Sequence, residues 1–276
     1  MQVREVLRKN GFRFEKRYGQ NFLTDENLLS ALVDKTGVSE NDTVVEIGVG
    51  AGTLTSALSK KVKRVIGFEI DKKLQPVLAE TLKDAKNVEI VYKDVMKIPT
   101  AEIETIAGGR FSIVANLPYY ITTPILMKFL EESDKVDLIA VTVQEEVADR
   151  MCAKPSTADY GALTLAIDVI GNAEKVMRIP RDMFYPAPNV DSAVAVVKID
   201  REKFEGVDTK AFRGVVRSAF SSRRKTLVNN LMQSFGLSRE KAEETVIAVK
   251  GDKTARGETL STAEFVALSR ILSSQV

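Results

Sequence analysis

The segment 43–143 alternates between short β-branched runs and helix-like stretches, and no other feature of the chain constrains the fold as strongly. Strands alternating with helices of this length are typical of βαβ units, which build a parallel sheet. We therefore predict an α/β fold. The expected strands are 43–48, 64–69, 88–92, 111–115 and 136–143, and the expected helices are 54–61, 72–83 and 123–132.

The pattern changes near residue 200. Before it, two further strand-like runs are expected at 164–170 and 192–199. After it, strand signals fade, and residues 201–276 carry fourteen Lys/Arg against nine Asp/Glu. This excess of positive charge suggests a polyanionic partner, although a solvated helix surface explains it as well. We predict two domains, 1–200 and 201–276. The helices expected in the second are 209–220, 223–234, 239–249 and 261–272.

The composition excludes several classes of chemistry. The chain has no histidine and a single cysteine, Cys152. Nucleophile systems built on Ser-His-Asp or Cys-His, and histidine-ligated metal sites, are therefore excluded, and we expect no metal. No apolar run approaches the length of a membrane span, and the N-terminus lacks the apolar region of a signal peptide. We expect a cytoplasmic, monomeric protein without a membrane segment.

Polar residues follow the first three expected strands. Glycines 48, 50 and 52 follow the first in the string EIGVGAG, Glu69 ends the second, and Asp94 follows the third. Ligands of open α/β sheets bind beyond the carboxyl ends of the strands, and an acid about 20 residues after the first glycine reaches ribose hydroxyls. Asp94 can accept from an adenine amine. Each feature alone also fits a tight turn or a surface acid, but together they predict an adenosine-binding pocket.

The fourth expected strand ends in Asn116-Leu117-Pro118-Tyr119. The side-chain oxygen of Asn116 and the carbonyl of Leu117 can each accept one N–H, and the ring of Tyr119 can stack on a flat ligand. A simple turn explains Pro118, but it does not explain why Asn and Tyr flank the proline. This tetrapeptide therefore predicts a site for a planar base that carries an amino group.

Seven strings in this order resemble a known family. The chain is similar to the ribosomal RNA adenine N6,N6-dimethyltransferases, and within them to the small-subunit (KsgA/RsmA) group. The glycine loop and Glu69 are shared with most class I methyltransferases, whereas NLPY followed by F-x-P-x-P-x-V-x-S is far more specific. The strings are GQNFL (19–23), EIGVGAG (46–52), GFEID (67–71), KDV (93–95), NLPYY (116–120), FYPAPNVDS (184–192) and FSSRRKTLVNNL (220–231).

The resemblance implies a Rossmann-like class I methyltransferase sheet with a smaller C-terminal helical domain. It also implies S-adenosylmethionine as cofactor, and as substrate two adjacent adenosines near the 3′ end of 16S rRNA in a partly assembled small subunit. Tyr119 and Phe184 would sandwich the target adenine. Phe184 alone could be a core aromatic, but the prolines at 186 and 188 favour an exposed, rigid loop. The remaining implied roles are cofactor contact for Asn21, Leu23 and Gly48, loop ordering for Glu46, ribose binding for Glu69, adenine binding for Asp94, and contact with both cofactor and target amine for Asn116.

Arg223, Arg224 and Lys225 sit at an expected helix start, in a stretch without acids. Cations there oppose the helix dipole, so we predict that they contact RNA phosphates; a solvated basic face is the alternative. Two other functions compete with the dimethyltransferase. A non-catalytic ribosome-assembly factor would be favoured by loss of Asn116 or Glu69, and both residues are present. A DNA or small-molecule methyltransferase is disfavoured by the NLPY string and the basic helical domain.

Overall fold

The computed structural model describes residues 3–273, apart from the side chain of Lys16. The chain forms two compact units. The first, here called the sheet unit, contains residues up to 148 together with 173–199. The second, the helical unit, contains 149–172 together with the chain from residue 200. The predicted change at residue 200 coincides with one crossing between the units, but the sequence pattern did not indicate that 149–172 belongs with the C-terminal helices.

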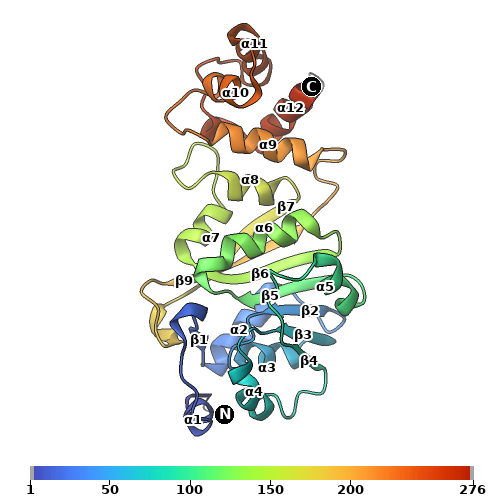
Figure 1. The fold of residues 1–276 in the computed structure, drawn as a ribbon, viewed down its shortest axis with the longest axis vertical. Coiled ribbons are helices and arrows are strands. Elements are labelled where there is room, and N and C mark those ends of the chain that lie inside the picture. Colours follow the sequence, from blue (N-terminus) through green and yellow to red (C-terminus); the bar gives the residue numbers. More distant parts are fainter. Residues whose placement is uncertain (1–2, 274–276) are drawn as a thin grey trace. The chain divides into compact units, whose positions relative to one another are not determined.

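A seven-stranded sheet with the order β4-β3-β2-β5-β6-β9-β7 forms the centre of the sheet unit (Figure 1). β2 pairs in parallel with β3 on one side and with β5 on the other, so the chain winds outward in both directions from β2. β9 runs antiparallel to β6. The predicted α/β class is confirmed. The strands are β2 Thr43–Ile47, β3 Arg64–Phe68, β4 Val88–Val91, β5 Phe111–Asn116, β6 Val136–Gln144, β7 Gly171–Ile179 and β9 Ser192–Ile199.

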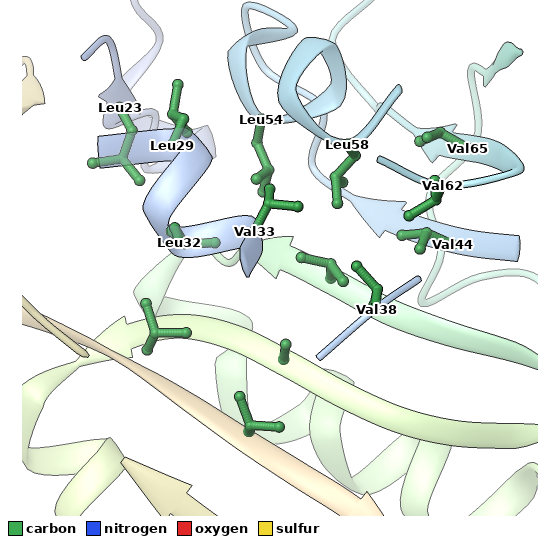
Figure 2. Close-up of a cluster of buried hydrophobic side chains, with 14 of the residues drawn as sticks. Leu23, Leu29, Leu32, Val33, Val38, Val44, Leu54, Leu58, Val62 and Val65 are labelled. Carbon is green, nitrogen blue, oxygen red and sulfur yellow. The ribbon is translucent and has the colours of Figure 1, made fainter. Parts of the chain in front are cut away.

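Helices that follow the strands cover the sheet. Leu29, Leu32 and Val33 of α2 and Leu54 and Leu58 of α3 pack in one cluster against strand residues (Figure 2). Strands β2 and β5 are buried almost throughout, as expected for parallel strands covered on both faces. The helices are α1 Val3–Lys9, α2 Glu26–Thr36, α3 Thr53–Ser59, α4 Gln75–Thr81, α5 Thr100–Ala107, α6 Thr122–Glu132 and α7 Glu145–Met151, the last of which runs into the helical unit.

A two-stranded ribbon joins the N-terminal segment to the proline-rich loop. β1 (Phe22–Leu23) pairs antiparallel with β8 (Phe184–Tyr185), with Leu23 opposite Phe184. Arg4 lies over the Tyr185 ring, 4.6 Å from its centroid. The resemblance assigns Leu23 to the cofactor and Phe184 to the target base, and backbone pairing therefore places these two residues side by side.

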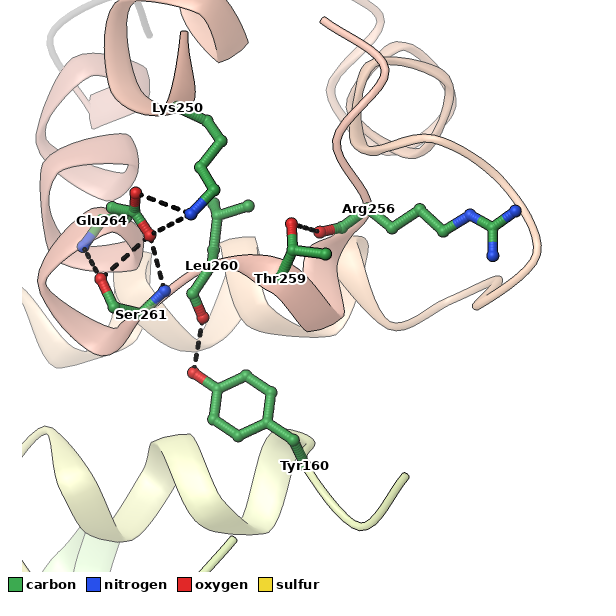
Figure 3. Close-up of polar contacts among 7 residues, drawn as sticks. All are labelled: Tyr160, Lys250, Arg256, Thr259, Leu260, Ser261 and Glu264. Carbon is green, nitrogen blue, oxygen red and sulfur yellow. Dashed lines mark hydrogen bonds and ion pairs between the residues drawn. The ribbon is translucent and has the colours of Figure 1, made fainter. Parts of the chain in front are cut away.

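The helical unit contains α8 Ala162–Asp168, α9 Thr209–Ala219, α10 Leu227–Phe235, α11 Arg239–Lys250 and α12 Thr262–Ser273. The hydroxyl of Tyr160 donates to the Leu260 carbonyl over 2.7 Å, and Lys250 binds Glu264 at the start of α12 (Figure 3). The first contact ties the segment before α8 to the turn between α11 and α12, and the second joins α11 to α12. The unit is therefore built from two separate stretches of sequence.

Two expectations for this region are wrong. The run 164–170 is mostly helix α8 rather than strand, and the strand follows it as β7. A short apolar run fits either structure, and the Thr164 hydroxyl, which accepts from the Gly161 N–H over 3.3 Å, favours a helix start here. The helix expected from residue 223 begins only at Leu227, because Thr226 caps it by accepting from the Asn229 N–H.

Candidate active site

The carboxyl ends of β2, β3, β4 and β5 and the segment 18–23 enclose a cavity of about 260 Å³. It lies beside the β2–β5 pair, where the winding of the sheet reverses, as expected for a ligand site in an open α/β sheet. Eight of the residues predicted for cofactor or target binding line it. They are Asn21, Leu23, Gly48, Glu69, Asp94, Asn116, Leu117 and Tyr119.

The glycine loop after β2 is held in a shape that only glycine allows. Gly50 has a φ of +57°, and a Cβ there would lie 2.7 Å from the ring of Phe22. The N–H of Gly48 donates to the Phe68 carbonyl over 2.8 Å, which ties the loop to the end of β3. With no side chains at these positions, the loop backbone itself forms the wall of the cavity.

Glu69 is buried at the end of β3, and backbone N–H groups hold its carboxylate. One oxygen, Oε1, accepts from Ile70 and Asp71, and the other, Oε2, accepts from Gly50, each over 2.8 Å. Burial raises the pKa of this carboxyl, and the three N–H donors oppose that rise. A carboxylate oxygen has two acceptor sites, so Oε2 retains one for a ligand hydroxyl.

Glu46 is the most unusual acid on the cavity wall. It is buried in β2, and its Oε2 meets no partner in hydrogen-bond geometry among residues 3–273. Burial raises its pKa to about 8, and the nearby Thr55 hydroxyl opposes that rise. The predicted role in ordering the glycine loop has no hydrogen bond from this oxygen to support it. This oxygen is shielded from solvent, so the fold keeps a buried carboxyl whose desolvation is only partly compensated.

Asp94 forms a turn, which was the alternative to a role in ligand binding. Its Oδ1 accepts from the Met96 N–H over 3.0 Å, and its Oδ2 lies 3.7 Å from Lys97 Nζ. The side chain nevertheless faces the cavity and keeps further acceptor capacity. The turn interpretation and the predicted contact with an adenine amine are therefore compatible.

The carboxamide of Asn116 has a fixed orientation. Its Nδ2 donates to the backbone carbonyl of Asn21 over 2.8 Å, so its Oδ1 points away from that carbonyl. Within residues 3–273, neither this Oδ1 nor the Leu117 carbonyl receives a hydrogen bond. Two acceptors from consecutive residues are thus left open at the cavity. The sequence could not show that the N-terminal segment sets this orientation.

The two aromatic residues predicted to sandwich the target base have different surroundings. Tyr119 begins a short 3₁₀ helix, Tyr119–Ile121, and lines the cavity. Phe184 is only 2% exposed, packs in the core cluster with Leu23 and Leu29, and does not line the cavity. The exposed position expected from the neighbouring prolines is therefore wrong for Phe184, because its ring packs against Leu23 and Leu29. Its stacking role stays a prediction that requires the ring to leave this packing.

Apolar residues on the cavity wall were not predicted. Ile70 and Met96 are exposed large hydrophobic residues there, and Tyr120 is 60% exposed. Ile70 and Met96 lie one and two residues beyond the predicted acids Glu69 and Asp94, and Tyr120 directly follows Tyr119. Their place within two residues of a predicted site residue was the signal that could have identified them.

In the helical unit, the predicted RNA-binding residues lie in a turn before α10. The guanidinium of Arg223 donates to the carbonyls of Ala158 and Tyr160, each over 2.9 Å. Lys225 Nζ donates to Gln233 over 3.2 Å. Arg223 therefore has a structural reason to be present, which the sequence interpretation did not foresee.

No helix within residues 3–273 is both long and apolar enough to cross a membrane. Over the same residues, no three His, Cys, Asp or Glu side chains come together as a possible metal site.

The family model for ribosomal RNA adenine dimethylase matches residues 11–272. Two proteins described as ribosomal RNA small subunit methyltransferase A are similar to this chain. The one from Geobacillus thermodenitrificans is 44% identical over 98% of this chain and 94% of that protein. The one from Clostridioides difficile is 43% identical over 99% of this chain and 96% of that protein.

Two solved structures share the fold. A dimethyladenosine transferase from Plasmodium falciparum matches with a TM-score of 0.78 and 22% identity, over 92% of this chain and 98% of that one. The 23S rRNA methyltransferase ErmE matches with a TM-score of 0.71 and 24% identity, over 92% of this chain and 100% of that one. The family model and the relatives at 43–44% identity, both spanning nearly the whole chain, show that this protein belongs to the ribosomal RNA adenine dimethylase family.

Proposed function

We propose that this chain transfers methyl groups from S-adenosylmethionine to N6 of two adjacent adenosines near the 3′ end of 16S rRNA, dimethylating each. Its substrate in this proposal is a partly assembled small ribosomal subunit, and it acts as a cytoplasmic monomer. The observation that carries the proposal is the pair of open acceptors, Asn116 Oδ1 and the Leu117 carbonyl, at a cavity whose wall also bears Glu69 and Asp94.

The groups on the cavity wall fit S-adenosylmethionine. Glu69 keeps one acceptor site for a ribose hydroxyl, and Asp94 keeps acceptor capacity for an adenine amine. When bound, the cofactor supplies a methyl group on an activated sulfonium.

The residues around N6 position the amine and polarise it. Its lone pair is delocalised into the adenine ring, so N6 is a poor nucleophile. The acceptors at Asn116 and Leu117 accept hydrogen bonds from both N–H groups of N6. This increases electron density on N6 as positive charge develops there. Alignment of the two reactants can contribute about 7–11 kcal/mol toward the barrier. The proton is lost readily from the methylated, positively charged N6, so no histidine base is required.

The two acceptors also explain why transfer stops at two methyl groups. Unmodified N6 has two N–H bonds to offer, the monomethyl product has one, and the dimethyl product has none. Each transfer leaves one acceptor unpaired, at a cost of about 1 kcal/mol or more in a site without water. The dimethylated base is therefore held least tightly and leaves.

Stacking and phosphate contacts hold the RNA in this proposal. The target base leaves its stack to enter the cavity, as in other enzymes that modify bases. Tyr119 lies on the cavity wall, where an aromatic face contributes about 1–3 kcal/mol to a stacked base. In the helical unit, Arg224 and Lys225 contact phosphates, and Arg223 holds the turn that presents them.

The test is incubation of the purified protein with methyl-labelled S-adenosylmethionine and unmethylated small subunits, followed by digestion and separation of the nucleosides. We expect label in N6,N6-dimethyladenosine, with free 16S rRNA a poorer substrate and DNA none. Binding to small subunits without any transfer would favour the non-catalytic assembly factor. Label in another nucleoside, or transfer to DNA, would refute the proposal.

A further inference from the structure

Ser192, the first residue of β9, is fully buried beside the cavity. It is followed by the apolar run Ala193–Val197, so its hydroxyl is the one polar side chain at this end of the strand. Buried hydroxyls need a hydrogen-bond partner. Within residues 3–273, that partner is the phenolic oxygen of Tyr119, 2.7 Å from Ser192 Oγ.

The sheet topology explains how two residues 73 positions apart meet. β5 and β6 are parallel, and Asn116 at the end of β5 is paired with Thr142 of β6. β9 runs antiparallel to β6, with Ser192 opposite Gln144. The start of β9 therefore lies at the same edge of the sheet as the carboxyl ends of β5 and β6, where Tyr119 follows Asn116.

The backbone that carries Ser192 is fixed from several sides. Asp191 accepts from the Arg181 N–H over 2.9 Å and from the Arg178 guanidinium over 2.6 Å. The Asp191 carbonyl accepts from the Glu145 N–H over 3.1 Å. These contacts lie within the sheet unit and hold the end of the proline-rich loop in place. The position of Ser192 Oγ is thus fixed, and the Tyr119 hydroxyl is hydrogen-bonded to it.

We propose that Ser192 is a positioning residue, whose hydroxyl holds the ring of Tyr119 in the plane that receives the target adenine. This inference rests on the proposed function, because it assumes that Tyr119 stacks on that base. A ring tethered at its far end is already in place when the base arrives, whereas an untethered ring must be ordered during binding. Core packing already fixes the ring of Phe184, whereas the ring of Tyr119 lies on the cavity wall. The orientation of Tyr119 therefore depends on its hydrogen bond to Ser192.

The test is a double-mutant cycle on methyl transfer to small subunits at saturating cofactor. S192A removes one partner of the hydrogen bond, and Y119F removes the other while keeping the ring. Each single variant should slow transfer to the RNA roughly three- to tenfold, the value of one hydrogen bond. S192A should add nothing in the Y119F background, because the two residues act through the same bond. Cofactor affinity, measured by calorimetry, should not change in S192A.

S133A is the matched control. Ser133 is also a buried serine of the sheet unit, and its hydroxyl donates to Glu104 over 2.7 Å, but it precedes β6 and so lies at the opposite edge of the sheet. We expect S133A to lower stability without changing the transfer rate. Additive effects in the cycle, a normal rate in S192A, or equal slowing in S133A would overturn the inference while leaving the proposed function intact. A wild-type protein that transfers no methyl group to adenosine would overturn both.

Discussion

Asn116 in the sheet unit and Arg223 in the helical unit both donate to backbone carbonyls, but the fold leaves them different remaining capacity. Asn116 donates a hydrogen bond from Nδ2 to the Asn21 carbonyl, which leaves its Oδ1 open at a cavity. Arg223 binds the carbonyls of Ala158 and Tyr160 with two of its five N–H groups, and these bonds account for its place in the turn. The difference teaches that a polar residue in a motif indicates function most strongly when its bonds within the fold leave an acceptor or donor open on a cavity wall.

Asn116→Ala tests the open side of this comparison and should have the largest effect. Loss of one of the two acceptors should lower the single-turnover rate of methyl transfer about 10²- to 10³-fold, as the loss of one preorganised hydrogen-bonding group does in other active sites. Asn41→Ala makes the same chemical change at an exposed position before β2, at the opposite edge of the sheet, and should leave the rate as it was. A rate in Asn116→Ala within a few-fold of wild type would contradict the role of Asn116.

Glu46→Gln tests whether the unpartnered carboxyl is held neutral by the fold. The pKa of Glu46 is about 8 in the folded protein and 4.5 in the unfolded chain. Between these two pH values, Glu46 is ionised in the unfolded chain and neutral in the folded protein. The unfolded state then binds fewer protons, and stability falls as pH rises. Wild type should lose stability relative to Glu46→Gln by up to about 1.4 kcal/mol per pH unit from pH 5 to 8. The measurement is urea unfolding across this range without cofactor, and parallel curves would refute a raised pKa.

Glu69→Gln tests an acid whose carboxylate already accepts three hydrogen bonds from the backbone. Loss of the charge should weaken S-adenosylmethionine binding about ten- to a hundredfold, measured by calorimetry. Because three backbone N–H groups bind this side chain, the variant should also unfold at lower urea. Glu89→Gln, on the exposed side of β4, should change neither property substantially. Unchanged cofactor affinity in Glu69→Gln would remove the ribose role.

Arg223→Ala and Arg224→Ala compare two neighbouring arginines in the turn before α10. We expect their effects on stability and RNA binding to be the smallest of those predicted. Loss of Arg223 removes one exposed and one partly buried hydrogen bond and should lower stability by about 0.5–1.5 kcal/mol. Loss of Arg224 should leave stability unchanged and reduce the slope of log affinity for small subunits against log salt by about 1. Filter binding in a salt series and urea unfolding separate the two residues. A reversed result would assign the phosphate contact to Arg223.

The local pattern was enough to predict the sheet and most of the cavity. Strand ends in a parallel sheet converge on one edge, so residues such as Glu69 and Asn116 could be placed together without a structure. What failed had two causes, a run whose local pattern is ambiguous and contacts between distant segments. The run 164–170 is apolar enough for a strand or a helix, and the hydroxyl of Thr164 favoured the helix. Neither the carbonyls bound by Arg223 nor the core packing of Phe184 has a signal in the local sequence.

The most direct test of the central claim is a time course of adenosine methylation on unmethylated small subunits. Two open acceptors, at Asn116 and Leu117, predict that N6-methyladenosine appears first and then declines. N6,N6-dimethyladenosine should rise to two residues per subunit and stop. An end product with one methyl group, or label at a position other than N6, would contradict the account.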